Sequence, residues 1–386
     1  MSAAGALGRP PVPLRSILVL TAPGDAYDAQ RATRWPRESG APVRVRATDR
    51  PDAARQAIES NAADAVAAAL GAARDAPLAR LAGDLRMRDR WIDYTPAPLA
   101  RAADGCISGR AEHSLTWALG FLVSANAHPY APLRYGADAE QIGDLRLPSP
   151  APARPPPLVV LLHGGFWREA YRRDVLAPLA VDLARRGVAT WNVEYRRVGG
   201  SGGGCPATFA DVAAAVDFTA RLRAMHALDP APPIVLGHSA GGHLALWCAA
   251  RRRLPPGMPG SEPAVAPSLV VAIGALADLA EGRRLELGAG AVDAFVPARA
   301  DEAWTNPRAL LPLGTPQLLV HGTLDESVPY SIAAAYVEAA RAAGDRVDWL
   351  PLPAVTHMPP IDPRSDAWGR IVEALCPRLF AVGGGS

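Results

Sequence analysis

The stretch that says most about the fold is residues 235–249, VLGHSAGGHLALWCA. An apolar run of β-formers leads into a glycine-rich turn, and a run of good helix formers follows it. Ser239 lies between Gly237 and Gly241, so the turn matches G-x-S-x-G, in which a sharp strand-to-helix turn exposes a serine above the sheet edge. Alternatively, Ser239 is only a small residue in an ordinary glycine-rich turn. Partner residues elsewhere in the sequence must decide between these two interpretations.

The sequence on both sides of this turn alternates short apolar runs with longer amphipathic ones. LVVLL, VATWNVEYR, SLVVAIGAL, PQLLVHG and RVDWLPLP predict strands. VLAPLAVDLARRG, TFADVAAAVDFTARLRAM, PYSIAAAYVEAARAAG and SDAWGRIVEALCPRLF predict helices. The alternation is typical of an α/β fold with a mainly parallel sheet and helices on both faces. Over about 251–312 the rhythm breaks, which predicts a cap or loop insertion over the functional face.

Two domains are expected, because 386 residues exceed the usual length of one. Six prolines between Leu147 and Leu158 mark the clearest boundary, since such a stretch cannot form a helix. A strand at SILVLTAP, a helical region over 52–73, a strand at RWIDYT and a helix over 112–125 predict a small α/β domain at the N-terminal side. The predicted parts are a disordered N-terminus (1–14), this domain (15–125), a linker with a lead-in strand (126–157), the main domain (158–380) and a flexible tail (381–386).

Composition excludes several function classes. A net charge of +2 supplies no basic field for nucleic acid or an anionic membrane. All 40 basic residues are arginine, so no lysine is available for a Schiff base, a pyridoxal phosphate or a phosphate-binding loop. The four cysteines lie far apart and predict neither a disulfide framework nor a zinc site. No apolar run near the N-terminus is long enough for a signal peptide or a membrane span, so a cytoplasmic location is expected.

A nucleophilic serine needs a base and an acid that orients the base. Asp325 follows the strand at PQLLVHG, and His357 follows the next predicted strand. The chain order Ser239, Asp325, His357 is the order of G-x-S-x-G hydrolases, and all three fall where the carboxyl ends of parallel strands gather ligands. Read singly, Asp325 could cap a helix and His357 could be an ordinary loop residue. The rival acids are Glu326, Asp348 and Asp362.

The oxyanion of an acyl-transfer reaction needs backbone donors. The sequence HGGFW follows the first strand of the main domain, where this architecture builds part of an oxyanion hole. We expect the N–H groups of Gly165 or Phe166 to act with that of Ala240. His163 is expected to brace the loop, and the two histidines that flank Ser239 are expected to be structural.

HGGFW, GHSAGGHLA, HGTLDESVP and THMPPIDP together resemble the α/β-hydrolase family that includes kynurenine formamidase (arylformamidase) and its bacterial esterase-like relatives, over about 134–380. The resemblance implies attack of Ser239 on a formyl or ester carbonyl, with His357 as base, Asp325 as its orienting acid, and no metal or organic cofactor. Phe166 and Met358 depart from the residues common in that family and would alter the acyl or aryl pocket. The candidates to line that pocket are Trp167, Tyr171, Trp304 and Met358.

The segments ILVLTAP, IESNAADAV and GCISGRAEHSLTWAL faintly resemble type II 3-dehydroquinate dehydratase, a flavodoxin-like enzyme. That family's chemistry is missing, because Ala62 and Ala63 stand where a His-Glu pair is expected and Thr95 where a catalytic His is expected. The resemblance therefore implies a degenerate domain, retained for assembly or to shape the hydrolase mouth, and a homo-oligomer through this domain.

Four functions follow from these patterns. The first is a serine hydrolase acting on a small aryl formamide or ester. The second is a peptidase or thioesterase-type hydrolase of specialised metabolism, which would use the same triad on a larger acyl group. A lyase on the N-terminal domain conflicts with the residues that replace its catalytic groups, and a non-catalytic scaffold conflicts with the complete triad.

Overall fold

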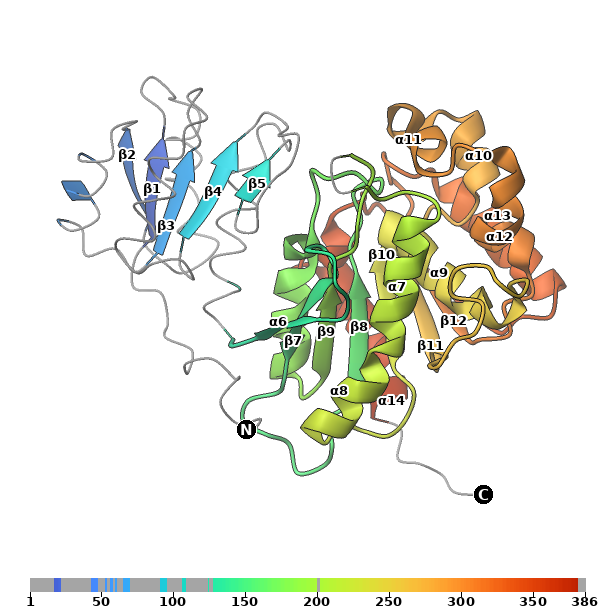
Figure 1. Cartoon of the computed structure of the whole chain (residues 1–386), viewed down its shortest axis with the longest axis horizontal. Coiled ribbons are helices and arrows are strands. Elements are labelled where there is room, and N and C mark those ends of the chain that lie inside the picture. Colours follow the sequence, from blue (N-terminus) through green and yellow to red (C-terminus); the bar gives the residue numbers. More distant parts are fainter. Residues whose placement is uncertain are drawn as a thin grey trace. The chain divides into compact units, whose positions relative to one another are not determined.

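The computed structural model describes residues 128–199 and 202–380, together with five strands and a few single helical residues earlier in the chain. The chain divides into two compact units, Gly8–Pro129 and a larger one that contains Tyr130–Ser386 (Figure 1). The N-terminus predicted to be disordered (1–14) and the predicted flexible tail (381–386) lie outside the described residues.

The smaller unit contains a five-stranded parallel sheet in the order β2-β1-β3-β4-β5. Its strands are β1 Ile17–Thr21, β2 Val43–Ala47, β3 Ala65–Ala69, β4 Trp91–Thr95 and β5 Cys106–Ser108. This is the strand order of flavodoxin-like sheets. Residues 62 and 63 and most of the helix predicted over 112–125 lie outside the described residues.

One prediction for the smaller unit is wrong. The helical region expected over 52–73 is helical at Ala53 and Ala57, but β3 occupies residues 65–69. The sequence of β3, AVAAA, has high helix propensity, yet this strand pairs with β1 on one side and β4 on the other. Pairing within the sheet therefore overrides local propensity here.

The larger unit is built on an eight-stranded sheet in the order β13-β12-β11-β10-β8-β9-β7-β6. Its strands are β6 Ala131–Arg134, β7 Ile142–Arg146, β8 Leu158–Leu162, β9 Ala189–Val193, β10 Ile234–His238, β11 Leu269–Ile273, β12 Gln317–Gly322 and β13 Val347–Leu352. Only the β6–β7 and β7–β9 pairs are antiparallel. Every residue of β8 to β12 is buried, which explains their continuous apolar sequences. The expected mainly parallel sheet is confirmed.

The domain boundary predicted at the proline-rich stretch is wrong. Strands β6 and β7 precede that stretch and complete the sheet of the larger unit, so residues 147–157 connect β7 to β8. The chain instead passes from the smaller unit to the larger one between Pro129 and Tyr130. Proline excludes a segment from a sheet interior because it lacks an N–H donor, but this does not distinguish a loop within a domain from a linker between two.

Helices cover both faces of the larger sheet (Figure 1). In this view α7 and α8 lie in front of the strands and α14 lies behind them. The Nε1–H of Trp368 on α14 donates to Asp182 on α6 at 2.8 Å, which ties these two helices together. The helices outside the insertion are α6 Ala177–Arg185, α7 Ala207–Asp217, α8 Thr219–His226, α9 Ala240–Ala250, α13 Tyr330–Ala342 and α14 Asp366–Leu379. The single helix predicted over 208–225 is two helices that meet at Phe218.

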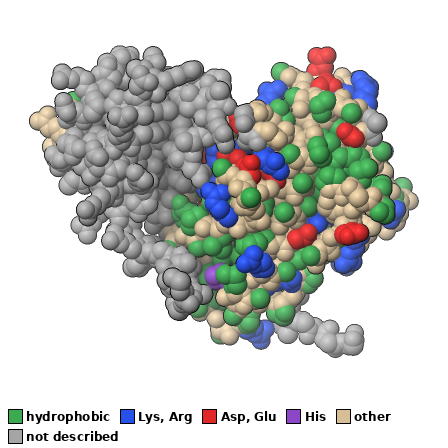
Figure 2. Space-filling model, viewed as in Figure 1, with side chains coloured by type: hydrophobic (Ala, Val, Ile, Leu, Met, Phe, Trp, Pro, Cys, Tyr) green, Lys and Arg blue, Asp and Glu red, His purple; other side chains and the backbone are tan. Residues whose placement is uncertain are grey.

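The insertion predicted over 251–312 is divided by strand β11. Its helical part lies between β11 and β12 and contains α10 Leu279–Arg284, α11 Leu287–Phe295 and α12 Glu302–Thr305. Figure 2 shows hydrophobic and charged side chains interspersed over the described part of one face. Among the described residues, no helix combines the length and the apolar character that crossing a membrane requires.

Candidate active site

Ser239 occupies a sharp turn between β10 and α9. Its φ of 55° and ψ of −119° are rare for a residue with a side chain, and its N–H donates to the Ile273 carbonyl at 2.8 Å. A Cβ at Gly241 would overlap the Leu162 carbonyl oxygen, and one at Gly164 would come within 2.9 Å of the Ser239 Cβ. The tightness of this packing explains the glycines around the serine, and the strained backbone points to a functional position.

Asp325 and His357 are paired by a hydrogen bond. The Nδ1–H of His357 donates to Asp325 Oδ2 at 2.7 Å, and both side chains are buried. The other carboxylate oxygen accepts the backbone N–H groups of Ser327 and Val328 at 2.9 and 2.8 Å. Burial alone would raise the pKa of Asp325, but hydrogen bonds from His321 and His357 hold that pKa well below its usual value. The carboxylate is therefore ionised and fixes the ring of His357.

His357 is held through its backbone as well as its ring. Its N–H donates to Glu326 Oε2 at 3.2 Å, and its carbonyl accepts a hydrogen bond from His238 Nε2 at 3.1 Å. Glu326 thus supports the backbone of His357 and is not the acid of the ring. The other rival acids are paired elsewhere, Asp362 with Arg364 and Asp348 with Arg378.

His238 brings the serine turn and the histidine together. It precedes Ser239 in the chain, and its ring centroid lies 4.5 Å from that of His357. Burial lowers the pKa of His238 to about 3, with a further contribution from His357, so the side chain is neutral. Because Asp325 occupies Nδ1 of His357, Nε2 is the nitrogen left available for proton exchange with a nucleophile.

The backbone donors predicted for an oxyanion lie beside Ser239. Ala240 is the first residue of α9, and the first N–H groups of a helix have no partner within it. Gly165, Phe166 and Trp167 all have positive φ, at 110°, 50° and 55°. No described residue accepts the backbone N–H of Phe166. The two N–H groups can therefore be offered to a developing negative charge, assisted by the dipole of α9.

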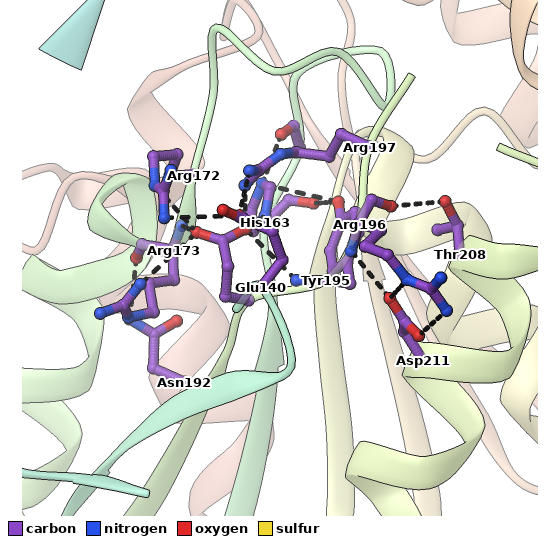
Figure 3. A network of polar contacts seen from close by, with 12 residues as sticks. Glu140, His163, Arg172, Arg173, Asn192, Tyr195, Arg196, Arg197, Thr208 and Asp211 are labelled. Carbon is purple, nitrogen blue, oxygen red and sulfur yellow. Dashed lines mark hydrogen bonds and ion pairs between the residues drawn. The ribbon is translucent and has the colours of Figure 1, made fainter. Parts of the chain in front are cut away.

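His163 belongs to a buried charged network behind this loop (Figure 3). Its Nε2 lies 3.0 Å from Glu194 Oε1, and its ring stacks on Tyr195 at 4.3 Å. Glu194 also contacts the guanidinium groups of Arg197 and Arg172. Burial opposes ionisation of Glu194, but the two arginines and His163 outweigh it, and its pKa lies well below the usual value.

The sequence analysis did not identify this network. The sequence nevertheless contains a pattern that points to it, because the charged residues of the segment VEYRR directly follow the buried strand β9. Charged groups are rarely buried at such a position unless they are paired. Through the ring of His163, the network braces the residues that lead into the loop of Gly165 and Phe166.

The predicted pocket residues fall into two groups. Trp167 is fully buried and stacks on Phe295 at 4.2 Å, and Trp304 is 7% exposed and packs on Phe209. Both tryptophans belong to the hydrophobic core in this structure, and their expected place in a substrate pocket stays a prediction. Met358, directly after His357, is 39% exposed, and Tyr171 packs over Gly165, so these two lie at the edge of the site.

Within residues 128–199 and 202–380 and the strands described before them, no three His, Cys, Asp or Glu side chains could hold a metal ion. The arrangement of Ser239, His357 and Asp325 is one that supports attack by a serine oxygen on a carbonyl carbon.

Comparisons with known proteins concern the larger unit. The BD-FAE family matches residues 144–255, which include Ser239 but neither Asp325 nor His357. No curated protein sequence matches the chain.

Several solved structures resemble it. A truncated carbohydrate esterase from gut microbiota is 17% identical with a TM-score of 0.54, over 64% of this chain and 94% of that one. The esterase Est2 of Thermogutta terrifontis is 21% identical with a TM-score of 0.54, over 66% and 92%. Esterase B of Lactobacillus rhamnosis is 19% identical with a TM-score of 0.56, over 64% and 84%. Together with the strand order, these likenesses show that the larger unit has an α/β-hydrolase fold.

Proposed function

We propose that the larger unit is a serine hydrolase that cleaves a small ester through an acyl-serine intermediate. The observation that carries this proposal is the 2.7 Å pair of Asp325 and His357, which packs against His238, the residue that precedes Ser239 and its strained turn. Strain of this kind persists only where the surrounding structure enforces it, and it clusters at functional sites.

The reaction would follow in two halves. Ser239 Oγ attacks the carbonyl carbon, His357 Nε2 takes the hydroxyl proton, and the N–H groups of Phe166 and Ala240 bind the oxyanion. The imidazolium then gives its proton to the leaving alkoxide as the C–O bond breaks, which releases the alcohol. In the second half His357 deprotonates a water that attacks the acyl-serine, and the proton returns to Ser239 as the acid leaves.

The choice of an ester rests on the likenesses. One structure of the Thermogutta terrifontis esterase is described as butyrate-bound, and one of the Lactobacillus rhamnosis esterase carries a tributyrin phosphonate. A short acyl chain on an oxygen leaving group is therefore our first candidate. The second candidate is an aryl formamide such as N-formylkynurenine, which the motifs HGGFW and GHSAGGHLA favour through their resemblance to arylformamidases.

The test measures kcat/KM for p-nitrophenyl butyrate and for N-formylkynurenine, with the wild type and Ser239→Ala. We expect hydrolysis of the ester by the wild type and none above background by the variant. A larger kcat/KM for the formamide would replace the first candidate by the second. Equal ester hydrolysis by both proteins would contradict Ser239 as the nucleophile.

We further propose that the smaller unit has no lyase activity and serves self-association. The replacements at positions 62, 63 and 95 of the sequence support the first part. The full chain should leave 3-dehydroquinate unchanged and should sediment as an oligomer in analytical ultracentrifugation. Dehydration of 3-dehydroquinate would contradict the first part, and a monomer at micromolar concentration would contradict the second.

A further inference from the structure

Three consecutive residues of the loop after β8 contact helix α11 of the insertion. The Phe166 ring packs against Gly288, where an added Cβ would lie 2.7 Å from two ring atoms. Trp167 stacks on Phe295 with an interplanar angle of 1°. Arg168 Nη2 donates to the carbonyls of Gly288 and Ala289, at 2.5 and 3.0 Å. The loop that carries the Phe166 N–H is therefore attached to a segment about 120 residues further along the chain.

The first turn of α11 has an unusual backbone that makes this attachment possible. Gly288, Ala289 and Gly290 have φ of 60°, 52° and 73°, so this turn is left-handed, and a kink separates it from the right-handed residues that follow. In a regular helix the carbonyls point along the axis toward the residues four positions on. Here two successive carbonyls instead accept from one guanidinium. The left-handed conformation disfavours a side chain, and yet Ala289 adopts it, which indicates that the surroundings enforce it.

The loop itself is also strained. Phe166 and Trp167 carry side chains at positive φ, a conformation that each would leave for negative φ if it were free. Such a change would rotate the neighbouring peptide planes, and with them the N–H groups of the loop whose Gly164 lies against Ser239. An oxyanion hole acts through donors that are already oriented, so whatever holds these two residues also holds the donor.

We infer that Gly288 and Ala289, called here the α11 anchor, hold the Phe166 N–H in its donating orientation through Arg168 and the Phe166 ring. This inference rests on the proposed function and assigns positioning roles to Arg168 and Gly288. Transition-state stabilisation then depends on the insertion between β11 and β12 as well as on the sheet. The anchor would affect kcat more than KM, because the oxyanion exists only in the transition state.

The chain offers a matched pair of variants for the test. Gly288→Ala and Gly290→Ala both add a Cβ at positive φ, so both carry a similar backbone cost. At Gly288 the Cβ meets the Phe166 ring, whereas at Gly290 no atom lies within 4 Å. We expect Gly288→Ala to lower kcat for p-nitrophenyl butyrate about 10- to 100-fold with KM changed less than about threefold, and Gly290→Ala to retain kcat within about threefold. Equal kcat values in the two variants would overturn the inference.

Arg168→Met supplies a second, independent variant should Gly288→Ala fail to fold. Arg168→Met removes the donor to both carbonyls and adds no backbone strain of its own. Arg168→Lys restores a donor at this position. We expect kcat to fall for Arg168→Met and to recover in part for Arg168→Lys. The inhibition constant of a trifluoromethyl ketone, which forms a tetrahedral oxyanion on serine, should rise in parallel with the loss of kcat/KM. A wild-type kcat in Arg168→Met would overturn the inference.

Labelling by a fluorophosphonate separates the inference from the function on which it depends. If the wild type hydrolyses the ester and Ser239 is labelled, equal kinetics of the two glycine variants refute the anchor alone. If the wild type neither hydrolyses the ester nor is labelled at Ser239, the proposed function fails, and the inference fails with it.

Discussion

The two halves of the candidate site are held in different ways. Asp325 and His357 lie on loops that directly follow β12 and β13, and short contacts with neighbouring loops fix them. The loop of Phe166 follows β8, but a buried charged network behind it and helix α11 of the insertion hold it in place. The base and its acid therefore depend on the sheet, and so does the donor of Ala240, which follows β10, whereas the donor of Phe166 also depends on a helix outside the sheet. Variants should separate these two kinds of support.

The largest effect should come from the serine that both halves serve. Ser239→Ala removes the nucleophile and leaves the loops unchanged, so kcat/KM for p-nitrophenyl butyrate should fall by about 10⁴- to 10⁶-fold. Circular dichroism and the melting temperature should match those of the wild type. A loss of less than tenfold would mean that the two halves do not serve this residue.

The next largest effect should come from the acid of the base half. Asp325→Asn keeps the shape of the side chain but cannot stabilise the imidazolium, so kcat should fall by about 10²- to 10⁴-fold. Glu326→Gln is the matched control, because among the described residues the carboxylate of Glu326 hydrogen-bonds only to the backbone N–H of His357. We expect this control to lose less than about tenfold. A larger loss for Glu326→Gln than for Asp325→Asn would reverse the two assignments.

The support behind the oxyanion half should appear in stability. Glu194→Gln removes one of the two carboxylates that pair with buried Arg172 and Arg197 and leaves only Glu140, and breaking a buried ion pair typically costs about 3–5 kcal/mol of unfolding free energy. The control is Glu281→Gln, which breaks an exposed pair with Arg284 and should have little effect on urea unfolding. Equal urea midpoints for the two variants would show that the network does not hold the loop.

A smaller effect is expected in the pH dependence of the unfolding free energy, to which one buried histidine contributes near each half of the site. Burial lowers the pKa of His238, in the base half, to about 3 and that of His243, beside Trp167, to about 4. Below about pH 6.5 these two histidines bind protons in the unfolded chain but stay neutral in the folded chain. Each histidine should therefore lower the unfolding free energy by about 1.4 kcal/mol per pH unit, down to about pH 3 and pH 4 respectively.

Urea unfolding at pH 7, 6 and 5 measures this slope. His243→Gln should reduce the slope by one histidine's share, because a glutamine does not titrate in this range. An unchanged slope in the variant would show that His243 is protonated in the folded chain.

The sequence predicted the strands that have a clear local apolar pattern. It missed the elements that are determined by pairing with strands far away in the chain. Apolar runs located β8 to β12, because every residue of these strands is buried. The alanine-rich β3 read as helix, since only its neighbours in the sheet make it a strand. The proline-rich stretch read as a linker, since nothing local shows that β7 pairs across it with β9.

The residues of the candidate site also fall into those that a local sequence pattern identifies and those that only the structure identifies. The residues of the proposed triad each follow a strand, so motif and chain order were enough to select them. The α11 anchor could not be selected in this way, because left-handed glycines and alanines in a loop-rich insertion form no periodic pattern. Its partner Arg168 is one of many arginines, and only the structure shows which carbonyls it binds.

The most direct test of the account is the mass of the full chain after reaction with a fluorophosphonate, followed by peptide mapping. The account predicts a single adduct on the peptide that contains Ser239, which is lost in Ser239→Ala and forms much more slowly in His357→Ala. An adduct on another residue, or one that forms equally fast in Ser239→Ala, would contradict it.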